Sequence, residues 1–71
     1  MNKVIVRGAG NPAGACRNAE AALATGAEVI SICAVSALLF WVFIRVRDAG
    51  HEREVDAAIE ARSLAQMRPE S

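Results

Sequence analysis

The sequence predicts an all-α protein: a single transmembrane helix with an Ala-rich N-terminal helical arm, a charged C-terminal helix and no globular core. Three observations lead to this prediction. A chain of 71 residues makes one structural unit at most and buries little surface. Its hydrophobic share of 54% is high for a soluble domain, and most of it lies in one run. The flanking segments are too polar or too small to cover that run, which favours lipid as its surroundings.

The run Val29–Ile44 contains no charge, no Gly and no Pro. Ten of its sixteen residues are Val, Ile, Leu or Phe, which favours membrane insertion of a helix by about 3 to 6 kcal/mol. As a helix it reaches about 24 Å, short of the roughly 30 Å hydrocarbon core. We therefore extend the predicted span to residues 27–46, with Arg45 reaching the interface.

Flanking charges predict the orientation of this span. Arg45 and Arg47 follow the run, whereas Glu20 and Glu28 precede it. The positive-inside rule then places the N-terminus outside and the C-terminus in the cytoplasm. Trp41, Arg45 and Arg47 are the expected anchors at the membrane interface.

The first half of the predicted span is rich in small residues, which let helices approach closely in lipid. We expect these residues to form the helix-packing surface: Ala27, Ser31, Cys33, Ala34 and Ala37.

Residues 1–26 are expected to form an arm that begins with a loop and continues as an Ala-rich helix. Asn11 suits the N-cap and Pro12 the first helical position. Gly26 either ends this helix or is a flexible point before the span, and the sequence leaves both open.

The stretch from Lys3 to Val29 resembles the opening of a dinucleotide-binding βαβ unit: a strand, a glycine-containing loop and an Ala-rich helix. Ala13 stands at the third glycine position and Glu28 at the expected acidic position. No further strands are predicted to build a parallel sheet, and the second strand would be the apolar run. Nucleotide binding is therefore not assigned.

Residues 47–71 are highly charged and predict a helix from about His51 to Met67, with Pro69 marking its end. Acidic residues recur every four positions and align on one helical ridge. The ridge consists of Asp48, Glu52, Asp56 and Glu60. It is either a solvated face or a docking ridge for a basic partner surface.

No residues are assigned to catalysis, to a cofactor or to a metal, and the chain is not expected to be an enzyme. His51 is a lone histidine in a charged helix, expected to be exposed. Cys16 and Cys33 lack metal-ligand spacing. Cys33 is expected to pack as a small residue. The sequence leaves open whether Cys16 forms an intermolecular disulfide.

Eight basic and eight acidic residues give no net charge, so no nucleic-acid partner is expected, and no small-molecule substrate either. The expected partners are the lipid bilayer and either larger membrane subunits or copies of the chain itself. The leading hypothesis is a non-catalytic, single-pass accessory subunit that packs its helix on a multi-span partner in a larger membrane complex. The alternative is a self-assembling virion coat or pilin-like subunit.

The alternative has a resemblance in its favour. An Ala-rich helix that leads into a span followed by Arg is similar in layout to filamentous-phage coat proteins. The similarity covers Pro12 to Arg47 in composition, and the charged segment from Asp48 onward departs from it.

Overall fold

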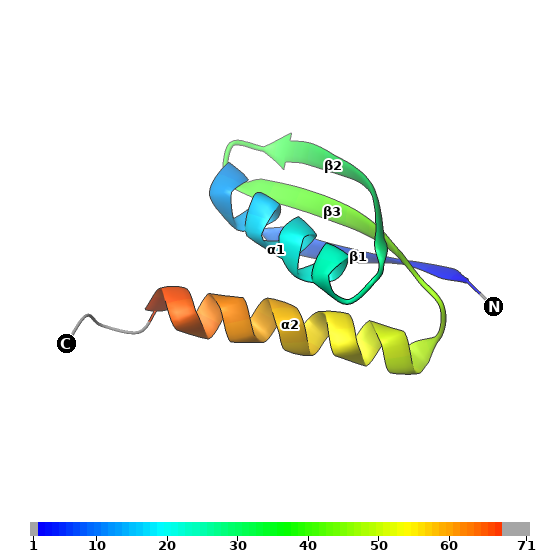
Figure 1. The fold of residues 1–71 in the computed structure, drawn as a ribbon. Helices are drawn as coiled ribbons and strands as arrows, with labels where there is room; N and C mark the ends of the chain where they lie inside the picture. Colours follow the sequence, from blue (N-terminus) through cyan, green and yellow to red (C-terminus); the bar gives the residue numbers. More distant parts are fainter. Residues whose placement is uncertain (1, 68–71) are drawn as a thin grey trace.

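The computed structural model describes residues 2–67, which form an α+β fold of three strands and two helices (Figure 1). In chain order these are β1 (Lys3–Ala9), α1 (Pro12–Ala24), β2 (Glu28–Ser36), β3 (Leu39–Val46) and α2 (Ala49–Met67).

The strands form one sheet in the order β1-β3-β2. The central strand β3 is antiparallel to both neighbours, and its Ile44 lies opposite Ile5 of β1 and Val29 of β2. Strands β1 and β2 therefore run parallel to each other, joined through α1, but β3 separates them. Each of them has one edge without a partner strand among residues 2–67.

The predicted all-α fold is wrong, because Val29–Ile44 forms β2 and most of β3 rather than a helix. Within residues 2–67, neither helix combines the length and the apolar character needed to cross a membrane. The transmembrane helix at 27–46 is therefore a wrong prediction. The membrane location and the orientation with the N-terminus outside, both derived from that helix, are corrected with it.

The run contains the features of two strands, although it shows no conventional turn signal. Residues with high β-propensity, Val, Ile, Phe and Trp, make up four of the first eight residues of the run and five of the second eight. The strands are joined by a short turn in which the Leu38 N–H donates to Ser36 Oγ at 3.2 Å. A serine hydroxyl thus supports a turn that has no Gly, Asn or Pro to mark it.

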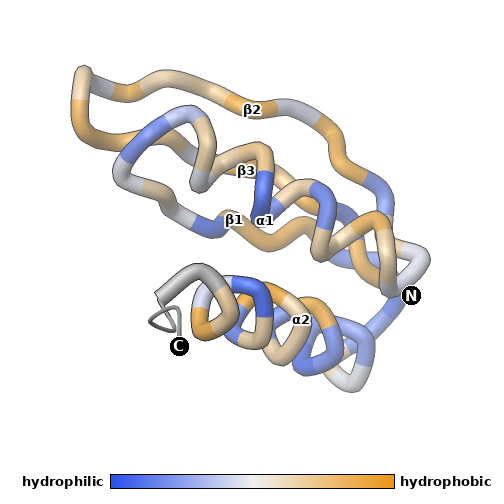
Figure 2. The backbone as a smooth tube through the Cα atoms, turned by 60° about the vertical axis from the view of Figure 1, so that its left-hand side comes forward, coloured by the Kyte–Doolittle hydropathy of each residue, from blue (hydrophilic) through white to orange (hydrophobic). Residues whose placement is uncertain are grey.

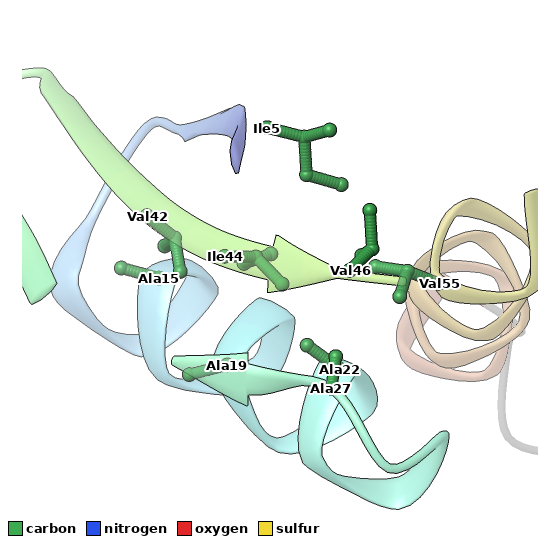
Figure 3. Packing of buried hydrophobic residues seen from close by; sticks show 9 residues of the cluster. All are labelled: Ile5, Ala15, Ala19, Ala22, Ala27, Val42, Ile44, Val46 and Val55. Atoms are coloured by element: carbon green, nitrogen blue, oxygen red, sulfur yellow. The ribbon is translucent and has the colours of Figure 1, made fainter. Parts of the chain in front are cut away.

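The chain also has a globular core, contrary to expectation (Figure 3). Alanines on α1 let this helix approach the sheet closely, because their side chains end at Cβ. Ile5 of β1 lies beside Ile44 of β3 in the sheet, and Val55 of α2 belongs to the same core. The core consists of Ile5, Ala15, Ala19, Ala22, Ala27, Val42, Ile44, Val46 and Val55.

Helix α1 begins as the sequence predicts. Asn11 is the N-cap, and its Oδ1 accepts the Gly14 N–H at 2.7 Å, with Pro12 at the start of the helix. The helix ends at Ala24 with Thr25 as its C-cap, and the next residue, Gly26, has a φ of 87°. The Ala27 N–H donates to the Ala22 carbonyl at 3.1 Å, the bond that closes a Schellman motif. Gly26 is thus a helix terminator and not a point within a longer helix.

Helix α2 begins at Ala49, two residues before the predicted start. Asp48 caps it, since its Oδ1 accepts the His51 N–H at 2.8 Å. The predicted end at Pro69 lies outside the described residues.

Candidate functional site

The side of the sheet that faces away from the helices carries apolar side chains that nothing in the described chain covers. Successive strand residues point to opposite faces, so the neighbours of buried Ile5 point outward. Val4 and Val6 are 54% and 41% exposed. Phe43 lies opposite Val6, and therefore on the same face.

The centre of this open face is aromatic. The rings of Trp41 and Phe43 meet edge to face, with centroids 6.5 Å apart at an interplanar angle of 72°. Gly8 lies opposite Trp41 in the register. A Cβ at Gly8 would lie 3.7 Å from Leu39 Cδ1 and 3.9 Å from Trp41 Cδ1, so both side chains lean over the β1 backbone there.

The charges of the open face form one neutral pair at its end. Arg45 of β3 lies opposite Glu28 of β2 in the register, and Arg45 Nη1 is 3.1 Å from Glu28 Oε1. The apolar part of the face lies between this pair and the β2–β3 turn. We define the open face by its apolar and aromatic members: Val4, Val6, Leu39, Trp41 and Phe43.

On β2 the open face carries Ser31 and Cys33, so the exposed apolar residues of this edge strand lie on its helix side or at its two register shifts. Ile30, Ile32 and Val35 are each 44% to 48% exposed. Figure 2 shows the hydrophobic colouring along β2 and β3, against the mixed pattern of α2.

The five residues expected to form a helix-packing surface do not share a helix. Ser31 and Cys33 lie opposite Phe43 and Trp41 on the open side of β2. The remaining three lie elsewhere: Ala34 on the helix side of β2, Ala37 in the β2–β3 turn, and Ala27 in the core at 5% exposure.

The expected membrane-interface anchors lie on or after β3. Trp41 and Arg45 point to the open face, as their partners in the register show. Arg47 follows the strand, and its N–H donates to His51 Nδ1 at 3.1 Å. These residues therefore belong to the sheet and its junction with α2.

Two members of the predicted docking ridge are paired within the chain. Glu52 contacts Lys3 Nζ and Arg7 Nη2, each at 2.8 Å. Asp56 accepts from Arg7 Nε at 2.6 Å and from its Nη2 at 2.9 Å. These bonds from β1 raise the pKa of Arg7, chiefly through Asp56, and lower the pKa of Glu52, chiefly through Lys3.

The other two members of the ridge differ from this pair. Asp48 is the cap of α2, and the His51 N–H lowers the pKa of its carboxyl group. Glu60 is exposed on α2.

His51 is buried at 2% exposure, contrary to the expectation of an exposed side chain. Its Nδ1 accepts the Arg47 N–H, so the proton of a neutral ring lies on Nε2. Nε2 lies 3.0 Å from the Thr25 carbonyl and 3.2 Å from Thr25 Oγ1. His51 thus joins the end of α1, the end of β3 and the start of α2, which is a structural role.

The residues that could bind a metal or a nucleotide are placed as follows. Within residues 2–67, no three His, Cys, Asp or Glu side chains are grouped as metal ligands would be. Cys16 and Cys33 are free and exposed, so Cys33 is not the packed residue that was expected. In the segment that resembles a βαβ unit, β3 lies between β1 and β2, and Asn11 already binds the first turn of α1.

No family model, curated protein or solved structure matches this chain. Its function must therefore be inferred from its own residues. Sequence reasoning missed Val4, Val6, Leu39 and Phe43 as members of a common surface. The run of β-branched residues Val4, Ile5 and Val6 was an available signal, since such residues favour a strand, in which successive side chains point to opposite faces.

Proposed function

We propose that the chain is a non-catalytic structural subunit that assembles with further copies of itself and buries its open face in the assembly. The observation that carries this proposal is the continuous apolar surface around Trp41. Aromatic side chains are typical anchors of protein interfaces. A cluster of aromatic and aliphatic residues without cover is more typical of an association surface than of a solvated one.

Charge favours a second copy as the occupant. The charges of Arg45 and Glu28 cancel each other at one end of the face. Two such faces can meet without repulsion between like charges. An acidic or basic partner, in contrast, would meet no net opposite charge on this face. The chain as a whole has no net charge either.

The same features bear on the choice between the two earlier hypotheses. An accessory subunit needs a partner of different sequence, and the open face shows no charge pattern that would select one. Self-assembly, the alternative from the sequence, needs only a self-complementary surface. Both hypotheses used a spanning helix, which residues 2–67 do not contain, so the proposal assigns assembly to the sheet.

Sedimentation equilibrium of the purified chain tests this proposal, with Trp41→Lys as the variant and Leu64→Lys as its matched control. Leu64 is 60% exposed on α2 and does not belong to the open face. We expect wild type and Leu64→Lys to associate above the 7.5 kDa monomer. Trp41→Lys should weaken association by about tenfold or more.

A wild-type chain that stays monomeric up to about 1 mM would contradict the proposal, since functional interfaces are normally tighter than that. Equal association of the two variants would contradict the role of the open face. Circular dichroism of both variants establishes that each one is folded.

A further inference from the structure

The two edges of the sheet differ in how they are protected. The edge strand β1 carries Lys3 and Arg7, whose side chains pair with Glu52 and Asp56 of α2. Charged residues and a neighbouring helix are common means of blocking further strand pairing. The other edge strand, β2, has no charge from Val29 to Ser36.

The helix side of β2 carries an apolar side chain that the described chain covers only in part. Ile32 lies opposite Val42 and therefore on the helix side of the sheet. Val42 is completely buried, whereas Ile32 is 44% exposed. Apolar side chains on this side of the sheet are buried on the central strand but half exposed on β2, because no second strand lies beside β2 among residues 2–67. The uncharged, largely apolar composition of β2 after Glu28 is therefore unusual for a strand at the edge of a sheet.

We propose that β2 pairs antiparallel with β2 of a second copy, so that two chains form one six-stranded sheet. This inference rests on the proposed self-assembly and names the strand that begins it. The two copies would be related by a twofold axis close to Ile32.

The charge of β2 suits this arrangement. Glu28 begins the strand and Ser36 ends it. In an antiparallel arrangement centred on Ile32, Glu28 of each copy lies toward the Ser36 end of the other, beyond the paired centre. The two carboxylates are then at opposite ends of the pair, and the uncharged segments between them face each other.

The register of β2 leaves a regular segment at this centre. Its pairing with β3 shifts between Val29 and Ser31 and again between Ala34 and Ser36. Such irregularities bend an edge strand and limit how far a partner can pair. The four residues from Ser31 to Ala34 lie between the two shifts, and pairing should be limited to this part of the strand.

The area of the open face gives a second reason for pairing at the edge. Strands of 7, 9 and 8 residues form a flat face of about 380 Å². Pairing through β2 doubles this flat area, so two stacked six-stranded sheets bury about twice as much surface as two three-stranded sheets. Edge pairing therefore enlarges the contact that the open face can make, and larger contacts are typical of stable interfaces.

Disulfide trapping tests this pairing. In a Cys16→Ser, Cys33→Ser background, Ile32→Cys carries one thiol at the proposed axis, and Leu64→Cys is the matched control on α2. Residues opposite each other in an antiparallel pair have Cα atoms about 4.5 to 5.5 Å apart, within reach of a disulfide. Under mild oxidation at micromolar concentration, we expect Ile32→Cys to form covalent dimers at least tenfold faster than Leu64→Cys.

Sedimentation of Ile32→Lys provides the second measurement, because a half-exposed position tolerates lysine without loss of the fold. We expect this variant to lose the dimer while its circular dichroism stays that of wild type. If the wild type assembles but Ile32→Lys assembles equally and Ile32→Cys forms no disulfide, the edge pairing is wrong and self-assembly stands. If the wild type is monomeric at every concentration, both proposals fail.

Discussion

Arg7 of β1 and Asp56 of α2 form a two-point ion pair, with Nε 2.6 Å from Oδ1 and Nη2 2.9 Å from Oδ2. The same guanidinium contacts Glu52 Oε2 at 2.8 Å. This fork geometry fixes the orientation of α2 beside β1, since both nitrogens must be satisfied together. It also protects the β1 edge of the sheet.

Arg7→Gln is expected to lower the free energy of unfolding by about 1 kcal/mol, because Arg7 is only partly exposed and both carboxylates lose their bonds. Urea denaturation measures the loss. Arg53→Gln, at an exposed position of α2, is the control and should change stability by less than about 0.5 kcal/mol. Equal effects of the two substitutions would contradict the role of Arg7.

Acidification should destabilise the protein through Glu52 and Asp48. Bonds from Lys3, and then from Arg7, lower the pKa of Glu52, and the His51 N–H lowers that of Asp48. A carboxyl group whose pKa is lower in the folded state stabilises the fold above its unfolded pKa and loses this contribution as the pH falls through the folded pKa.

The unfolding free energy should therefore change little from about pH 7 to pH 5 and fall below about pH 4, where carboxylates protonate. Urea midpoints across this range measure it. Glu52→Gln should show a shallower fall, because one of the two groups no longer titrates. A variant with the same acid profile as wild type would show that Glu52 does not contribute.

His51→Ala is expected to cost about 2 to 3 kcal/mol, because it opens a cavity and leaves the Arg47 N–H and the Thr25 carbonyl without their partner. Chemical denaturation measures the loss. Glu54→Ala, an exposed change on the same helix, should have little effect. A loss below about 0.5 kcal/mol for His51→Ala would show that the junction does not depend on this imidazole.

Gly26→Ala should destabilise the protein by about 1 to 2 kcal/mol, because a Cβ is strained at a φ of 87°. Gly10→Ala is the matched control, since the nearest atom to its Cβ would be 3.9 Å away. Thermal unfolding of both variants compares them. Equal melting temperatures would contradict the helix termination described for Gly26.

The helices could be predicted from the sequence because their signals are local. Asn11 and Pro12 mark the start of α1. The charged composition of residues 47–71 predicts a helix from about His51 to Met67, and this range lies within α2. Capping and propensity act within a few residues and need no tertiary partner.

The sheet could not be predicted in the same way. An uninterrupted apolar run is compatible with a buried helix or with buried strands, and periodicity does not separate them. The turn between β2 and β3 depends on Ser36 and carries no Gly or Pro. The core also depends on the alanines of α1. Each alanine has a small apolar surface, and only the close approach of the helix to the sheet lets these residues cover it.

Much of the candidate site depends on pairing between distant residues. Trp41 stood out in the sequence, but its neighbours Val6 and Gly8 come from β1. The acidic ridge was visible from its four-residue spacing. Its partners Lys3 and Arg7 lie more than forty positions away, and spacing within α2 contains no information on them.

The fluorescence of Trp41, the single tryptophan, tests the burial of the open face most directly. Acrylamide quenching is measured from about 1 µM to about 1 mM protein, the range in which weak association takes place. We predict strong quenching at low concentration, where Trp41 is 41% exposed. Emission should shift to shorter wavelength and quenching should weaken as the chains assemble. Quenching that stays strong while the chain associates, or no association at all, would contradict assembly through this face.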